Sequence, residues 1–365
     1  MNPQYPVYVL SYNRWQDGRR LTIKALEALG IPYTVVVEPE EYDLYAAVVP
    51  KKNIKIMPQE YHHNYDACVT KAEGSRQGTG PVRNFIWDDA IKRGYKRHWV
   101  LDDNVRAFYR FDNNKRLYVG DGTIFRAMED FVDRYTNVAL AGPNYVMFVT
   151  DRQKVPPFYL NTRIYSMLLI KNDIPYRWRA RYNDDTDLSL RVLKDGWCTI
   201  LFNTFLGQKI ATQKVKGGLT DQIYLKEGTL TKSQLIVKLH PDVTRLVWKF
   251  GRWHHHVDYR QFKNNKLIRR SDVELSQHSD NYGMIIAPND NNPIKTEAND
   301  NNFPKKQGND NNSDVSEPTV NNFPEKQGNV NKSGKKGKNV NKSGKKKGND
   351  NNFPKKTPIV NKSRN

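Results

Sequence analysis

The sequence predicts an α/β fold, a mostly parallel β-sheet flanked by helices. The chain opens with an apolar run at residues 6–10, a helix-periodic stretch at 21–29 and a β-branched run at 33–37. Such a β-α-β unit implies parallel strands joined by a right-handed crossover. The first strand is not followed by a GxGxxG fingerprint, which argues against a dinucleotide-binding domain.

The remaining elements follow from hydrophobic periodicity and from turn residues. We expect strands at residues 53–58, 97–101, 138–142, 164–170 and 197–202. We expect helices at residues 42–49, 81–94, 125–135, 185–195 and 230–239. Pro81 suits the first turn of its helix, and the polar segment before it, residues 59–80, is predicted to be a loop near the functional site.

Composition divides the chain into a folded domain, residues 1–275, and a low-complexity tail, residues 276–365. Asn, Lys, Gly, Ser and Pro dominate the tail, and Asn-Asn-Phe-Pro recurs at residues 301, 321 and 351. Because the tail has too few apolar residues to bury a core, we predict that it is disordered.

The charge of the chain points to a polyanionic partner. The formal net charge is +20, of which the residues from Gln277 onward contribute +7, so the folded part is itself basic. The commonest such partner is nucleic acid, although basicity for solubility gives the same composition. Two cysteines form no disulfide framework and favour a reducing cytosol. Without an evident signal peptide or membrane-spanning run, we expect a cytoplasmic protein with no membrane partner.

The first cluster that carries chemistry is Asp102-Asp103-Asn104, directly after an apolar strand. Ligands of open α/β sheets bind outside the carboxyl ends of the strands. Carboxylate and amide oxygens suit Mg²⁺ or Mn²⁺, which can hold a diphosphate as a Lewis acid. The alternative interpretation is a solvated acidic turn.

The second cluster is Asn183-Asp184-Asp185-Thr186-Asp187 at the start of a predicted helix. Asn183 or Asp184 could cap this helix. An acid held among other acids has a raised proton affinity, which suits a general base, and we choose Asp185 for that role with Asp184 beside it. Asp187 is expected to orient Arg191 at the i+4 spacing.

Three further segments are weaker candidates for ligand binding. Gly78-Thr79-Gly80 enters the helix that carries Arg83 and Asn84, and it offers backbone N–H groups to phosphate or sugar oxygens. A basic glycine loop around Lys216 could close over a diphosphate, or be a plain surface turn. One of the three consecutive histidines at 254–256 could complete a metal site.

Aromatic and basic residues interleave at residues 176–182, just before the second acid cluster. Arg179 and Arg181 are candidates for phosphate contacts, and Trp178 for stacking on an extruded base. A half-buried structural strand is the alternative.

Together these motifs resemble those of a GT-A fold glycosyltransferase, and more narrowly those of the TET-associated glycosyltransferase family. The resemblance rests on Leu-Asp-Asp-Asn closing a strand and on Asn-Asp-Asp-Thr-Asp-Leu before a Gly-Trp strand. The matching stretches are residues 5–11, 37–42, 98–104, 179–188, 195–199 and 216–221. Two departures are Asp184, where glutamate is commoner, and the three histidines at the late metal position.

The resemblance implies a metal-dependent enzyme that moves a sugar from a nucleotide-sugar donor, expected to be a UDP-sugar, to a hydroxymethylated pyrimidine in DNA. A dioxygenase that oxidises pyrimidines would act upstream. By analogy, Ser11 and Arg14 lie near the nucleotide base, Asp185 faces the acceptor and His255 is the late metal ligand.

The predicted residues fall into four sets. The catalytic residues are Asp185 and Asp184, the donor-binding residues are Ser11, Arg14, Arg83, Asn84, Asp102 and Lys216, the acceptor-binding residues are Trp178, Arg179 and Arg181, and the metal ligands are Asp102, Asp103, Asn104 and His255. The alternative functions are a metal-dependent nucleotidyltransferase or nuclease, and a non-catalytic DNA-binding module.

Overall fold

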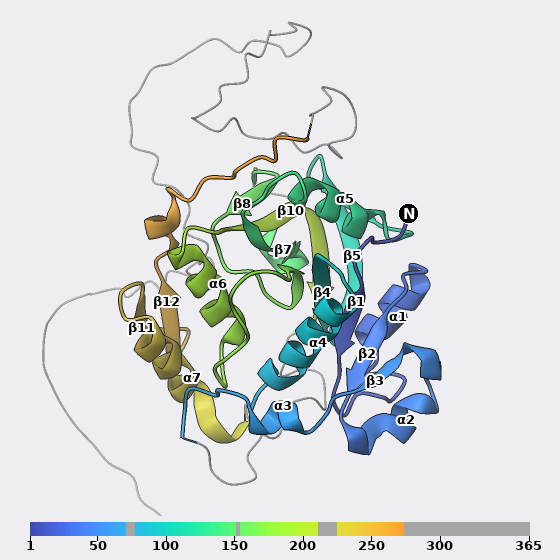
Figure 1. Cartoon of the computed structure of the whole chain (residues 1–365). Helices are drawn as coiled ribbons and strands as arrows, with labels where there is room; N and C mark the ends of the chain where they lie inside the picture. Colours follow the sequence, from blue (N-terminus) through green and yellow to red (C-terminus); the bar gives the residue numbers. More distant parts are fainter. Residues whose placement is uncertain (71–76, 151–153, 211–224, 274–365) are drawn as a thin grey trace, which may run out of the picture. The chain divides into compact units, whose positions relative to one another are not determined.

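The computed structural model describes residues 1–70, 77–150, 154–210 and 225–273 (Figure 1). The predicted tail, residues 276–365, lies outside the described residues, as does the predicted donor-binding residue Lys216. None of the described helices has the length and apolar character needed to cross a membrane.

A ten-stranded mixed sheet forms the centre of the fold, with the order β3-β2-β1-β4-β9-β7-β10-β5-β6 and β8 paired to β10. Strands β3, β2, β1 and β4 are parallel neighbours, and β7 runs parallel to β10. The predicted mostly parallel sheet is therefore confirmed, as is the β-α-β unit at its start. Strand β9 is antiparallel to both of its neighbours, β4 and β7.

The strands of this sheet are β1 Val7–Leu10, β2 Thr34–Val37, β3 Ile54–Ile56, β4 Arg97–Asp102, β5 Val105–Asp112, β6 Lys115–Tyr118, β7 Val138–Tyr145, β8 Phe158–Leu160, β9 Met167–Lys171 and β10 Cys198–Lys209. The α-helices are α1 Leu21–Ala28, α2 Tyr42–Ala46, α3 Glu60–His63, α4 Gly80–Lys92, α5 Thr123–Val132, α6 Asp184–Lys194 and α7 Leu225–Leu239. A separate hairpin pairs β11 Thr244–Lys249 with β12 Arg252–Val257.

Alternation along the strands divides the core between the two faces of the sheet. Val7 and Val9 of β1 pack with α1 and α5 on one face. Tyr8 and Leu10 of the same strand pack with α4 and α6 on the other face. Burial on both faces explains why β1 and its neighbours read as continuous apolar runs, and it fixes the strand ends at which the polar residues begin.

The structure adds a hairpin at residues 105–118 and excludes one alternative of the sequence analysis. Residues 105–118 form the β5–β6 hairpin, whose turn at Asn113 and Asn114 has positive φ angles of 47° and 59°. Residues 176–182 form no strand. The alternative interpretation of that segment as a half-buried strand is therefore wrong.

Candidate active site

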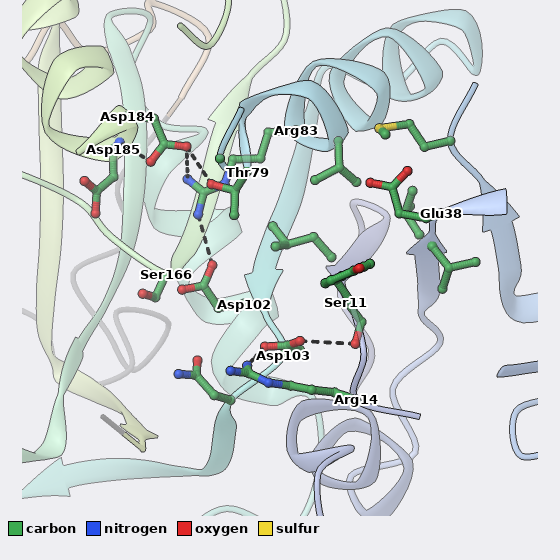
Figure 2. Close-up of a pocket in the computed structure, with 18 of the residues that line it drawn as sticks. Ser11, Arg14, Glu38, Thr79, Arg83, Asp102, Asp103, Ser166, Asp184 and Asp185 are labelled. Atoms are coloured by element: carbon green, nitrogen blue, oxygen red, sulfur yellow. Dashed lines mark hydrogen bonds and ion pairs between the residues drawn. The ribbon is translucent and has the colours of Figure 1, made fainter. Parts of the chain in front are cut away.

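A pocket of about 250 Å³ lies at the carboxyl ends of β1, β2 and β4 and beside the start of α6 (Figure 2). Residues from all these elements line it, together with Arg83 of α4 and Lys209 at the end of β10. The structure thus brings together both predicted acid clusters, as expected for an α/β sheet whose strands end at one edge.

Asp102 is the last residue of β4 and is held by two cations. Arg83 donates to its Oδ1 at 3.0 Å, and Lys209 donates to its Oδ2 at 2.8 Å. Burial alone would raise the pKa of Asp102, but Lys209 and Arg83 hold it well below its usual range. The carboxylate is therefore ionised, and both of its oxygens are occupied.

Asp103 lies in the turn after β4 and contacts a different set of residues from Asp102. Arg14 forms an ion pair with its Oδ1, and the Ser11 hydroxyl donates to its Oδ2 at 3.2 Å (Figure 2). Tyr45 joins this group, since its hydroxyl lies 2.6 Å from that of Ser11. Ser11 and Arg14 thus line the pocket as predicted, at the end that also contains Glu38.

The second acid cluster begins α6 on the other side of the pocket. Asp184 accepts a hydrogen bond of 2.7 Å from the Thr79 hydroxyl, and its Oδ2 lies 3.7 Å from Arg83 Nη1. Burial raises the pKa of Asp184; Arg83 opposes this rise, and the charge of Asp185 adds to it. The raised proton affinity predicted for the cluster is therefore found at Asp184. Asp185 uses Oδ1 to accept the Thr186 N–H at 2.7 Å, and both acids line the pocket.

Arg83 connects the two acid clusters. Its side chain is 5% exposed, and its guanidinium lies over the Trp178 ring, 4.5 Å from the ring centroid. Among the described residues, no hydrogen-bond acceptor meets its buried Nε and Nη1 atoms. These donors sit in the pocket wall, where an anionic ligand would satisfy them.

The glycines before α4 allow the chain to approach its neighbours closely. Gly78 has a φ of +86°, and a Cβ there would lie 2.6 Å from the Arg181 carbonyl oxygen. A Cβ on Gly80 would overlap the Tyr65 side chain. The predicted glycine-rich loop therefore lines the pocket with Gly78 and Thr79, and its spacing is required by packing.

Asp187, fully buried, anchors the segment before α6. It accepts from Arg191 at 2.8 Å, which confirms the predicted i+4 pair. It also accepts from Arg179 and from His240. Arg179 is therefore held in a structural ion pair, with its side chain 34% exposed.

The structure contradicts two of the predicted ligand contacts. Trp178 is buried beneath Arg83, so no face of its ring is open to a base, and the stacking role proposed for it is wrong in this conformation. Asn84 exchanges two hydrogen bonds with the Trp178 backbone, at 3.0 and 2.9 Å, and does not line the pocket. Its amide is therefore structural. Arg181 is buried as well, and it lies outside the pocket lining.

The four predicted metal ligands do not converge. Both Asp102 oxygens and both Asp103 oxygens already accept from Arg83, Lys209, Arg14 and Ser11. Across the described ranges, no three Asp, Glu, His or Cys side chains form a metal-ligating group. Asn104 Oδ1 is buried without a hydrogen-bond partner, yet one amide oxygen is not a metal site.

His255, on β12, is not among the residues that line the pocket. Burial and Arg163 lower its pKa to about 4, and Asp185 acts in the opposite direction. The histidine therefore lies within electrostatic range of Arg163 and Asp185. As arranged, the donor set does not fit a directly bound metal ion.

Several pocket residues escape sequence analysis. Arg163 also lines the pocket, and Lys209 and Ser166 lie on segments far along the chain from Asp102, the acid that they meet. Lys209 is 107 residues from Asp102. The one available signal is position, because Lys209 and Glu38 each stand at the carboxyl end of a strand or just after it.

Comparisons with known proteins are consistent with this geometry. A family model described as TET-Associated Glycosyltransferase matches residues 5–218. No curated protein matches the chain. Among solved structures, the mannosyltransferase Ktr4p from S. cerevisiae is similar at 16% identity and a TM-score of 0.24, over 38% of this chain and 38% of that chain. This chain thus covers well under half of that enzyme, and so weak a likeness carries no argument.

Proposed function

Because the chain belongs to the TET-associated glycosyltransferase family, we propose that it transfers a sugar from a nucleotide-sugar donor, a UDP-sugar, to a hydroxymethylated pyrimidine in DNA. The observation that carries this proposal is the single pocket lined by both acid clusters, with Arg83 and Lys209 between them. The basic charge of the chain agrees with a DNA acceptor. A pyrimidine-oxidising dioxygenase would supply the acceptor hydroxyl.

In this proposal the nucleoside occupies the end of the pocket formed by Ser11, Arg14 and Glu38. We propose that the Glu38 carboxylate, just after β2, accepts a hydrogen bond from a ribose hydroxyl, with His62 Nε2 holding it at 2.9 Å. Arg14 remains paired with Asp103 and gives this end a fixed shape. The sugar would then extend toward Asp184 and Asp185.

Arg83 and Lys209 are proposed to bind the diphosphate. Both are buried cations at the pocket wall, and Arg83 has two N–H groups available for new acceptors. Charge-assisted hydrogen bonds to the leaving diphosphate stabilise the negative charge that develops on it. We derive no step through a metal ion, since the predicted ligands do not fit one.

Asp185 is proposed to take the proton from the acceptor hydroxyl. It lines the pocket beside Asp184, and Figure 2 shows these two acids next to each other near Arg83. A positioned general base typically contributes about 10²–10⁴-fold to a rate. When the acceptor oxygen attacks the anomeric carbon, its proton would pass to Asp185 and the nucleoside diphosphate would leave.

The test is a thermal-shift screen of nucleotide sugars against the full chain, with Mn²⁺ and separately with EDTA. A donor at about 100 times its dissociation constant should stabilise the protein by about 2.7 kcal/mol. The donor identified is then incubated with an oligonucleotide containing 5-hydroxymethylcytosine, and the product mass is measured. A donor that binds but yields no glycosylated DNA would refute the acceptor, and no binding by any nucleotide sugar would refute the reaction class.

A further inference from the structure

The β11–β12 hairpin turns at a bulky residue that has a positive φ angle. Its two turn residues, Phe250 and Gly251, have φ angles of +52° and +71°. A two-residue turn of this kind requires positive φ at both positions and favours Asn-Gly. The β5–β6 hairpin meets the same requirement with Asn113 and Asn114. A bulky residue with positive φ is an outlier that costs free energy.

The Phe250 ring meets the His254 ring edge to face, with centroids 6.2 Å apart, and it lies outside the buried core. The Phe250 side chain is 62% exposed, so most of its apolar surface remains in water. Strained backbone that packing does not require is concentrated at ligand-binding segments. The turn therefore places a largely exposed aromatic ring at the tip of the hairpin.

The hairpin has two chemically different faces, because residues opposite one another in an antiparallel pair share a face. On one face Trp248 lies opposite Trp253, and Leu246 lies opposite His255. The two tryptophan rings meet edge to face, with centroids 5.3 Å apart. Their exposed fractions are 60% and 38%, which makes this pair the largest exposed aromatic surface of the hairpin.

The other face is basic. Lys249 lies directly opposite Arg252, an arrangement of like charges that destabilises a bare hairpin. Throughout the part of the chain that the structure describes, no carboxylate is seen to pair with either residue. Two facing cations without an acid favour a polyanionic partner.

The aromatic face leads toward the proposed active site. His255, on the same face as the two tryptophans, lies within electrostatic range of Arg163 and of Asp185, which line the pocket. Helix α7 packs against both strands of the hairpin and against α6, and Figure 1 shows α6, α7 and the hairpin side by side. The rings therefore extend outward from the acceptor side of the pocket.

We propose that this hairpin binds the acceptor nucleic-acid strand. Trp248, Trp253 and Phe250 stack on bases that flank the target nucleotide, while Lys249 and Arg252 contact its phosphates. Stacking platforms combined with cations are the usual means of binding single-stranded or extruded nucleotides. The proposal rests on the proposed function, since it assigns the acceptor-binding surface of that same site.

The test measures binding of a fluorescently labelled single-stranded oligonucleotide containing 5-hydroxymethylcytosine to the full chain, by fluorescence anisotropy at fixed salt. Trp248→Ala and Phe250→Asn should each weaken binding by about 5- to 150-fold, the range for one stacked base. Phe250→Asn creates the Asn-Gly turn that this geometry prefers, so its melting temperature should be unchanged or higher. A purely structural role for Phe250 predicts no loss of binding in this variant.

Tyr118→Ala is the matched control, because Tyr118 is a 70% exposed aromatic residue on the other hairpin. It should change binding by less than about 2-fold, below the range for a stacked base. Replacing both Lys249 and Arg252 with Gln should reduce the slope of log affinity against log salt concentration by about 1.4, for two lost phosphate contacts.

Two outcomes would overturn the proposal. Wild-type DNA affinity in folded Phe250→Asn and Trp248→Ala would exclude base stacking. Wild-type DNA affinity together with an altered sedimentation coefficient would identify the hairpin as a protein interface instead. The thermal shift given by UDP is measured in each variant, so a failure of donor binding, which concerns the proposed function, is distinguished from a failure of this surface.

Discussion

Lys209→Met is the substitution that most directly tests the cationic diphosphate site. It keeps the length and apolar stem of the side chain and removes the ammonium group. In the native structure Lys209 Nζ lies 2.8 Å from Asp102 Oδ2, and the lysine side chain is 13% exposed. Lys209 also donates to the Ser166 hydroxyl. The variant leaves Arg83 as the remaining cation on Asp102.

Two effects of different size are expected. Breaking a buried ion pair completely costs about 3–5 kcal/mol, and because Arg83 remains, we expect a loss of about 2 kcal/mol in the free energy of unfolding. A hydrogen bond to a charged group contributes about 1.5–3 kcal/mol, so the dissociation constant for UDP should rise about 10- to 150-fold. The rise in the dissociation constant for UDP is the effect that tests the diphosphate site.

The assay is calorimetric titration of UDP into the folded variant, with unfolding by urea followed in parallel. Lys194→Met is the matched control, because Lys194 forms an ion pair of the same kind with Asp242, at 2.7 Å, on the surface. Such pairs contribute about 0–1 kcal/mol, and this one lies outside the pocket. A folded Lys209→Met protein that binds UDP within about 3-fold of wild type would refute the reasoning, since an ionic contact contributes more than that.

Three further predictions concern the acids and the glycine loop. Asp185→Asn should leave UDP binding unchanged and lower the transfer rate by about 10²–10⁴-fold; a large loss of UDP affinity would instead make Asp185 a donor ligand. Burial raises the pKa of Glu129 to about 7 from 4.5. Its contribution to the free energy of unfolding is therefore fully present below about pH 4.5 and is lost as the pH rises through 7, and this loss amounts to about 3 kcal/mol. Chemical unfolding at pH 5 and pH 8 should show this slope, and Glu129→Gln should remove it. Gly78→Ala places a Cβ against the Arg181 carbonyl and should lower donor affinity and the melting temperature together, because Thr79 would shift from Asp184; unchanged values of both would show that the loop adapts.

The part of the fold that sequence analysis predicts is the part specified by local patterns. The parallel strands β1, β2 and β4 follow from apolar runs between turn residues, and the Asp187–Arg191 pair follows from helical spacing. The direction of β9 does not follow, because a continuous apolar run suits a buried strand of either direction. The turn at Phe250 was not predicted either, since this position carries none of the usual turn residues.

The active site, too, combines features that local sequence patterns predict with features that they do not. Adjacency of Asp102 and Asp103 in sequence suggested a shared metal ion, but Asp102 ends β4 and pairs with Arg83, whereas Asp103 lies in the following turn and pairs with Arg14. The cations that occupy their oxygens come from distant segments, Lys209 from 107 residues away. No local pattern encodes such a pairing. The burial of Trp178 is likewise a tertiary feature, because Arg83 covers its ring from helix α4.

Arg83 also gives the site a means of coupling donor binding to proton transfer. Its Nη2 lies 3.0 Å from Asp102, and its Nη1 lies 3.7 Å from Asp184. If a donor diphosphate draws the guanidinium toward itself, Asp184 and Asp185 lose a counter-charge, and the proton affinity of the acid pair rises. The base then becomes stronger once the donor is bound, so we expect the donor to bind before the acceptor. In initial-rate measurements UDP should inhibit competitively against the donor and noncompetitively against the acceptor DNA. Competitive inhibition by UDP against both substrates would show that Arg83 does not order the reaction.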